Sequence, residues 1–251
     1  MAKLVTFGMV GDEIQNLKES GASAYRTLKK CAKIACNFWN GHIDPKKNVV
    51  IQISAFNDRN VTTIARAWTP FEENGVVYSK VEFNAARIYG ETFVSTVMIH
   101  EICHSLGFGW ETLGRLYDKE TGLFYPEYIQ QIPELAEMKI ELDYGPATRY
   151  AHWDEETFGQ ELMTGMKNLS DDYVLPVTIK IMKLFGHKVV SVPEEKLKLN
   201  DKTIRQLSKI KFSRQRDVSL IDTLYERETT ISEEHNPKVS WFEKLINFFK
   251  L

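Results

Sequence analysis

The spacing of apolar residues in the first third of the chain predicts strands interrupted by one long helix. Residues 3–10 and 48–56 have the short apolar or alternating patterns of strands, and residues 17–39 between them have helical spacing. Two more strands are expected at residues 61–68 and 76–83, because a turn sequence, Glu72-Glu73-Asn74-Gly75, separates them. Strands mixed with helices in this way predict an α+β fold.

A second helix is predicted next, because apolar residues again recur at helical spacing: Phe93, Val94, Val97, Met98, Ile102 and Leu106. Gly107 and Gly109 flank Phe108 directly after it, so the chain can leave this helix sharply. A later helix is expected at residues 175–185, after Asp171-Asp172 and before Gly186.

The pattern changes after residue 190. Residues 191–251 are rich in Lys, Arg, Glu, Asn and Gln, so we expect an appendage behind a main domain of residues 1–190. Residues 239–251 predict an amphipathic helix with this apolar face: Trp241, Phe242, Leu245, Ile246, Phe248, Phe249 and Leu251. Such a face should dock on its own domain or bind a protein partner. Membrane attachment is disfavoured, because few basic residues lie on the polar face.

Composition narrows the possible functions. The 251 residues can bury a sizeable core, and a net charge of −2 gives no basic field that would favour nucleic acid. Neither a secretory signal nor a membrane span is expected from the pattern. Cys31 and Cys36 lie on one predicted helix, and Cys103 on another, so free thiols are expected. These features favour a cytoplasmic protein or a component of a phage particle.

The chemistry is concentrated in the predicted helix that contains His100, Glu101 and His104. Histidines four residues apart present their imidazoles on one helix face and can bind Zn²⁺, while Glu101 can reach a water on the same metal. A catalytic zinc usually has a third protein ligand. Of the other four histidines, His42, His187 and His235 are expected to be solvated, and His152 lies in a segment rich in apolar and aromatic residues. Downstream carboxylates are the competing third ligands: Glu155, Glu156 and Glu161.

The glycine-terminated HExxHxxG helix resembles that of the metzincin metallopeptidases. Trp110 stands where the compact form of that motif has its third histidine. The chain is instead similar to the leishmanolysin branch, in which the third histidine follows an insertion and precedes a tryptophan, as His152-Trp153 does here. Residues 161–165, Glu-Leu-Met-Thr-Gly, resemble the methionine turn of that branch, with Met163 as the turn residue.

The resemblance implies an α+β, two-lobed zinc endopeptidase with a mixed, twisted sheet and an active-site helix. Its upper lobe would be about residues 1–107, and its smaller, helical lower lobe about residues 108–190. It implies that His100, His104 and His152 hold one Zn²⁺ and that Glu101 acts as general base and acid. A peptide substrate would bind as an added strand along residues 62–68 or 80–83, and the inserted residues 111–150 would shape one side of the cleft, with their aromatic residues mainly packing the insertion. The competing function is a structural or binding component of a larger assembly, such as a phage particle, that retains this scaffold.

Overall fold

A mixed five-stranded sheet is the centre of the fold in the computed structural model, which describes residues 3–167 and 172–210. Its strands are β1 (Val5–Met9), β3 (Asn48–Phe56), β4 (Ala65–Ala67), β5 (Phe71–Glu73) and β6 (Val76–Asn84). β3 pairs in parallel with β1 on one side and with β6 on the other, and β4 and β5 run antiparallel along the far side of β6. The mixed sheet, the α+β class and the strands expected at 48–56 and 76–83 are confirmed.

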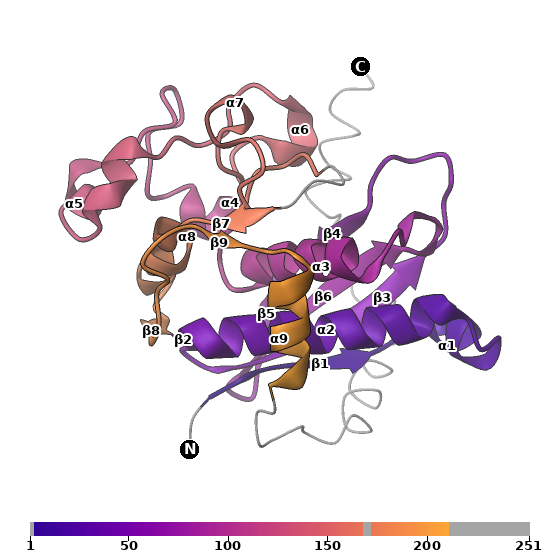
Figure 1. Ribbon diagram of the computed structural model, residues 1–251. Helices are drawn as coiled ribbons and strands as arrows, with labels where there is room; N and C mark the ends of the chain where they lie inside the picture. The colour runs from indigo at the N-terminus through magenta and orange to yellow at the C-terminus, as the bar shows by residue number, and fades with distance from the viewer. Residues whose placement is uncertain (1–2, 168–171, 211–251) are drawn as a thin grey trace.

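Two long helices, α2 (Ser23–His42) and α3 (Glu91–Ser105), pack against each other over this sheet (Figure 1). Trp39 of α2 is completely buried, and its indole N–H donates to the carbonyl of Ile99 in α3 over 2.9 Å. Asn40 joins the same helix to β1, since its amide exchanges two 2.8 Å hydrogen bonds with the backbone of Val5. The apolar faces of α2, α3 and the sheet form one continuous core.

The prediction of one continuous helix at residues 17–39 is wrong, because the structure has two helices there. The chain forms α1 (Asp12–Glu19), breaks, and starts α2 at Ser23. Gly21 causes the break: its φ of +67° lies in the left-handed region that glycine adopts without steric cost, and the carbonyl of Gly21 accepts a hydrogen bond from Arg26.

The strand expected at residues 61–68 is reduced to the three residues of β4. The loop before β4 is bonded to the side chain of Asn84, which is completely buried, instead of pairing with a strand. Its side-chain amide donates to the carbonyls of Asp58 at 2.7 Å and Thr63 at 3.2 Å. Two backbone carbonyls of this loop therefore have a side-chain hydrogen-bond partner in place of a neighbouring β-strand. Residues 80–83, one of the two segments expected to form a free sheet edge, lie in β6 and are covered by β4, which pairs with β6 there.

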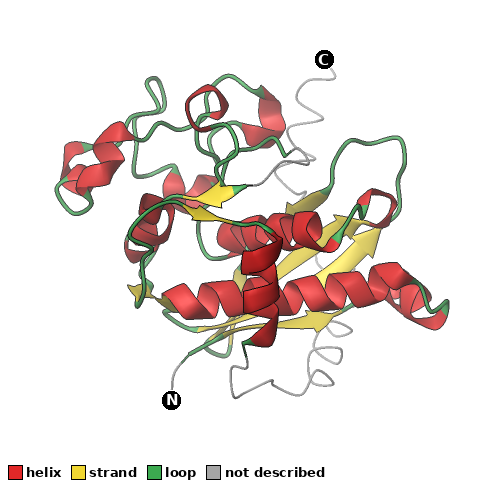
Figure 2. Cartoon of the chain, viewed as in Figure 1, coloured by secondary structure: helices red, strands yellow, loops and turns green. Residues whose placement is uncertain are grey.

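Short helices and loops make up most of the chain after α3 (Figure 2). The short α-helices between α3 and residue 190 are α4 (Trp110–Leu113), α5 (Pro126–Ile129), α6 (Gly145–Thr148), α7 (Glu155–Phe158) and α8 (Pro176–Lys180). The helix expected at 175–185 is shorter than predicted, because α8 begins at Pro176 and tightens into the 3₁₀ helix η3 (Ile181–Lys183). Packing is confirmed for two of the four aromatic residues considered in the insertion: Tyr117 and Phe124 are buried in the core. Tyr128 is partly buried against it, and Tyr125 is 39% exposed.

Part of the segment expected to be an appendage packs on the main domain. The two-residue strand β9 (Leu197–Lys198) pairs with β7 (Tyr173–Val174), and α9 (Asp201–Lys209) lies across α2. The Asn37 amide of α2 donates to the carbonyls of Leu207 and Ile210 over 2.9 and 3.1 Å. The amphipathic helix expected at 239–251 lies outside the described residues, as does His235.

The three cysteines are unpaired and buried, as expected. Among the described residues, none of the helices combines the length and the apolar run that crossing a lipid bilayer requires.

Trp39 is a sensitive position of the core that α2, α3 and the sheet form. Trp39→Ala is expected to lower the free energy of unfolding by about 3–5 kcal/mol, because it empties a fully buried site between α2 and α3. The matched control is Trp110→Ala, at a tryptophan that is 42% exposed, which should change the free energy by less than about 1 kcal/mol. Urea titrations of both variants measure the difference, and equal losses would contradict this account of the core.

Candidate metal centre

Helix α3 presents His100 and His104 on one face, with ring centroids 4.6 Å apart. The helix ends directly after them, and Gly107 follows with a φ of +115°. A Cβ atom at Gly107 would lie 3.1 Å from the side chain of Phe185, so both conformation and space favour glycine here. The sharp exit brings the carbonyl of Phe108 back to the Nδ1 atom of His104, with which it forms a short hydrogen bond.

His152 reaches the same point from the loop between α6 and α7. The carbonyl of His152 accepts from Glu141 N over 2.9 Å, and the next residue, Trp153, donates its N–H to the carbonyl of Met163 over 2.9 Å. Trp153 is completely buried and packs edge-on against Phe108, with centroids 4.9 Å apart. Packing of the loop against the end of α3 therefore brings together histidines that are 48 and 52 residues apart in sequence.

Each of the three imidazoles has its Nδ1 atom against a backbone carbonyl. The distances are 2.6 Å from His100 to Leu162 O and 2.7 Å from His152 to Thr148 O, and His104 has its short bond to Phe108 O. A carbonyl oxygen can only accept, so Nδ1 must carry the proton. Each neutral ring then has an unprotonated Nε2 atom with a free lone pair.

The three Nε2 atoms face one another at 3.0, 3.1 and 3.3 Å. In this tautomer no proton lies between them, so three lone pairs are held together without a hydrogen bond. A cation removes that repulsion. Three nitrogen ligands about 2.0–2.1 Å from a tetrahedral Zn²⁺ are about 3.3 Å apart, which matches the observed separations. The residues present therefore fit a metal ion.

Burial keeps these imidazoles in the neutral form that binds metals. Burial lowers the pKa of His104 to about 4, and the pKa values of His100 and His152 are held well below the usual range. For His100 and His152 the second cause is the neighbouring His104, because a second positive charge in the cluster would be repelled.

Glu101 is 6% exposed and lies beside this cluster on α3. Burial raises the pKa of its carboxyl group to about 8, against the opposing effects of a hydrogen bond from the backbone N–H of Ala67 and the charge of Lys167. The carboxyl group therefore titrates near neutral pH.

None of the carboxylates considered as third ligands joins the histidine cluster. The Glu155 carboxylate accepts from Met166 N over 3.0 Å, and Glu156 is exposed. Glu161 is completely buried, but its carboxylate accepts from the N–H groups of Met163 and Leu175. Within residues 3–167 and 172–210, the ligand-type side chains that converge are His100, His104 and His152.

The expectation of solvated side chains at His42 and His187 is wrong. Both are half-buried. The His42 ring bonds to Ser191 O over 2.9 Å, and the His187 ring donates to Leu106 O over 2.7 Å. Both histidines thus hold the chain after α8 to the ends of α2 and α3. Nothing in their spacing along the sequence indicated these contacts.

A cleft of about 510 Å³ opens over the histidines. Its floor is α3, with His100, Glu101 and His104. One wall is residues 62–70, which include β4, and other parts of the lining come from residues 148–152 and 165–167. Trp110 also lines this cleft and is not part of the histidine cluster. Sequence reasoning missed Lys167, which also lines the cleft and has a side chain only 6% exposed.

The metal-free protein should lose histidine-dependent stability as the pH falls from 7 to 5. Unfolded histidine titrates near about 6.5, and the folded pKa values are lower, so in this window only the unfolded state gains these protons. Each histidine should then cost up to about 1.4 kcal/mol of unfolding free energy per pH unit. Urea titrations in EDTA at several pH values should give His152→Gln a shallower dependence than wild type. Superimposable pH profiles would contradict the neutral cluster.

Comparison of the sequence with protein-family models and with curated proteins finds no match.

Proposed function

We propose that the chain is a zinc-dependent endopeptidase of the metzincin type. The observation that carries this proposal is the arrangement of three neutral imidazoles at the floor of an open cleft, with an uncoordinated buried carboxylate, Glu101, beside them. Structural zinc sites are normally closed by four protein ligands, whereas catalytic sites have three and an open position. An open three-histidine site favours catalysis over a purely structural metal.

Zinc is the proposed metal because imidazole nitrogen suits it and three histidines form a known catalytic ligand set. Bound Zn²⁺ supplies Lewis-acid chemistry, since it lowers the pKa of water and polarises a carbonyl group. The contribution of the chain is to hold His100, His104 and His152 in fixed tautomers through their backbone carbonyl partners.

Glu101 is the proposed general base and acid. Its carboxylate would take a proton from the attacking water and deliver it to the leaving amine nitrogen of the cleaved peptide bond. Two features support this role: a fixed position against the N–H of Ala67, and a pKa that burial raises to about 8 in the metal-free chain and that the charge of a bound cation would lower toward neutral pH. The nearby charge of Lys167 favours the ionised form that accepts the proton.

Strand β4 is the proposed docking edge for an extended peptide. Trp68 N donates to Lys80 O at 2.9 Å and Asn84 N donates to Ile64 O at 2.8 Å, so these groups of the β4 segment face β6. Because alternate peptide groups of a strand point to opposite sides, and because the N–H of Ala67 is bonded to Glu101, the groups left directed away from β6 are the N–H and carbonyl of Ala65 and the carbonyl of Ala67. A substrate strand could pair with them along the cleft wall.

The arrangement around the histidines supports the metzincin assignment. The helix that provides two ligands ends at Ser105, two residues before Gly107. The proposed third ligand precedes the buried Trp153, and the buried Met163 lies in a turn that bonds to Trp153. On this proposal residues 1–107 form the upper lobe and residues 108–190 form the lower lobe with the methionine turn.

Glu101→Gln should retain one zinc per chain and lose peptide hydrolysis by at least about a hundredfold, because it removes the proton acceptor and leaves all three imidazoles in place. Zinc content by elemental analysis and cleavage of a mixed peptide library by mass spectrometry measure the two effects. The matched control is Glu111→Gln, because Glu111 is an exposed carboxylate on the lining of the same cleft.

The control variant should keep both zinc and activity. If Glu101→Gln hydrolysed peptides at the wild-type rate, the proposed mechanism would be wrong. A wild-type chain that binds zinc but cleaves no peptide in the library would instead favour the scaffold function in an assembly.

A further inference from the structure

Glu161 is a completely buried carboxylate beneath the metal centre whose acceptor positions are occupied by three donors. Its Oε2 atom accepts from Met163 N over 2.6 Å. Its Oε1 atom accepts from Leu175 N over 3.0 Å and from the Thr178 hydroxyl over 2.7 Å. A carboxylate bonded in this way is held in one orientation.

The first consequence concerns His100. Leu162 lies between Glu161 and Met163, so the bond from Met163 N to the Glu161 side chain fixes the turn that contains the Leu162 peptide group. The carbonyl of Leu162 accepts the Nδ1–H of His100 over 2.6 Å. The direction of that carbonyl sets the rotation of the His100 ring and therefore where its Nε2 atom points.

The second consequence concerns His152, through Trp153. The Thr178 hydroxyl donates to Glu161 and accepts the indole N–H of Trp153 over 3.0 Å. The backbone N–H of Trp153 also donates to the carbonyl of Met163 in the same turn. Glu161 is thus linked to the residue that follows His152 by two routes, one through a side chain and one through the backbone.

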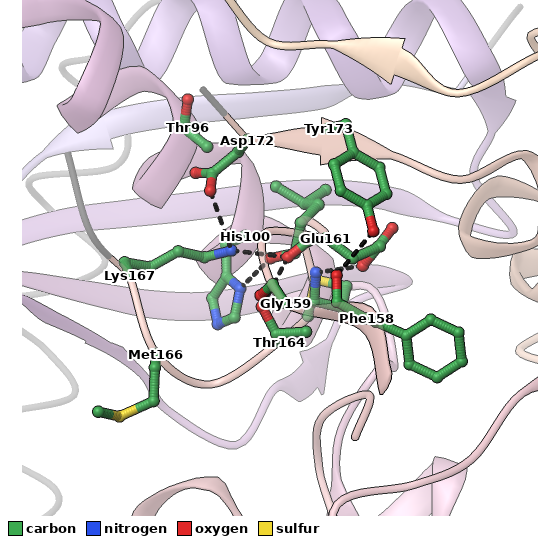
Figure 3. Close-up of polar contacts among 12 residues, drawn as sticks. Thr96, His100, Phe158, Gly159, Glu161, Thr164, Met166, Lys167, Asp172 and Tyr173 are labelled. Atoms are coloured by element: carbon green, nitrogen blue, oxygen red, sulfur yellow. Dashed lines mark hydrogen bonds and ion pairs between the residues drawn. The ribbon is translucent and has the colours of Figure 1, made fainter. Parts of the chain in front are cut away.

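Lys167 holds the same turn from the other side (Figure 3). Its ammonium group donates to the backbone carbonyl of Glu161 over 2.9 Å and lies 3.8 Å from the Asp172 carboxylate. Both the side chain and the backbone carbonyl of Glu161 are therefore engaged by charged or polar partners. Figure 3 shows this network next to His100.

We propose that Glu161 is a positioning residue for the metal centre: without binding the metal, it fixes the Leu162 carbonyl and Trp153 so that His100 and His152 present their Nε2 atoms together. The inference rests on the three-histidine metal site proposed above but does not depend on peptide hydrolysis. Its nearest rival is a structural role, in which Glu161 stabilises the fold and leaves the metal ligands unaffected.

The test measures Co²⁺ affinity by competition with a chromophoric chelator, together with the visible absorption spectrum of the Co²⁺-loaded chain, which reports ligand geometry. Glu161→Gln should weaken Co²⁺ affinity by about 10- to 100-fold, the usual effect of removing a residue that orients a metal ligand, and change the spectrum. Glu82→Gln is the matched control, since Glu82 is also buried but bonds to Arg66, Trp68 and Lys80 on the sheet.

The control should lose thermal stability without losing Co²⁺ affinity. Thr178→Val tests the same network without altering the carboxylate: it should weaken Co²⁺ binding, and Thr178→Ser, which keeps the hydroxyl, should restore it. Wild-type affinity and spectrum in both Glu161→Gln and Thr178→Val would overturn the positioning role. A wild-type chain that binds neither Co²⁺ nor Zn²⁺ would overturn the metal site and this role together.

Discussion

The structure around the histidine cluster is subject to one constraint. The Nε2 lone pairs of three buried imidazoles are held about 3 Å apart, where they repel one another unless a cation binds. Three backbone carbonyls impose this arrangement, because each accepts an Nδ1 proton and leaves Nε2 bare. Each carbonyl comes from a different segment, at Phe108, Thr148 and Leu162. The turn after α3, the end of α6 and the turn before Met163 must therefore form together.

The loop-rich half of the molecule meets this requirement with little regular structure. In that half, buried carboxylates accept hydrogen bonds from backbone N–H groups that would pair with neighbouring strands in a sheet. Glu141, which is 2% exposed, accepts from the N–H groups of Asp143, Tyr144 and Glu155, and Asp154 caps the short helix α7 by accepting from Thr157 N. Together with Glu161 they satisfy backbone donors that a loop would otherwise leave unpaired. The part of the chain up to the end of α3, by contrast, is stabilised by apolar packing of α2 and α3 on the sheet.

Backbone strain is also found close to the site. Tyr150, two residues before His152, has a φ of +70°, which is uncommon for a residue with a side chain. Its N–H donates to Glu141 O over 2.9 Å and its carbonyl accepts from the Tyr117 hydroxyl over 3.0 Å. Surrounding hydrogen bonds therefore maintain a conformation that turns the chain toward the histidine cluster.

The sequence by itself determined the features set by local pattern: the strands β3 and β6, the helix α3 with its glycine exit, and the pair His100 and His104, because four residues span one helical turn. It also indicated His152, although only the resemblance to a known family separated it from nearby carboxylates. The tertiary structure decided the rest. Asn84, which is distant in sequence, bonds to Thr63 in the loop before β4, where a longer strand was expected. Glu161 does not act as a ligand, because its carboxylate accepts hydrogen bonds from Met163, Leu175 and Thr178. Hydrogen bonds between segments far apart in sequence leave no periodic signal along the chain.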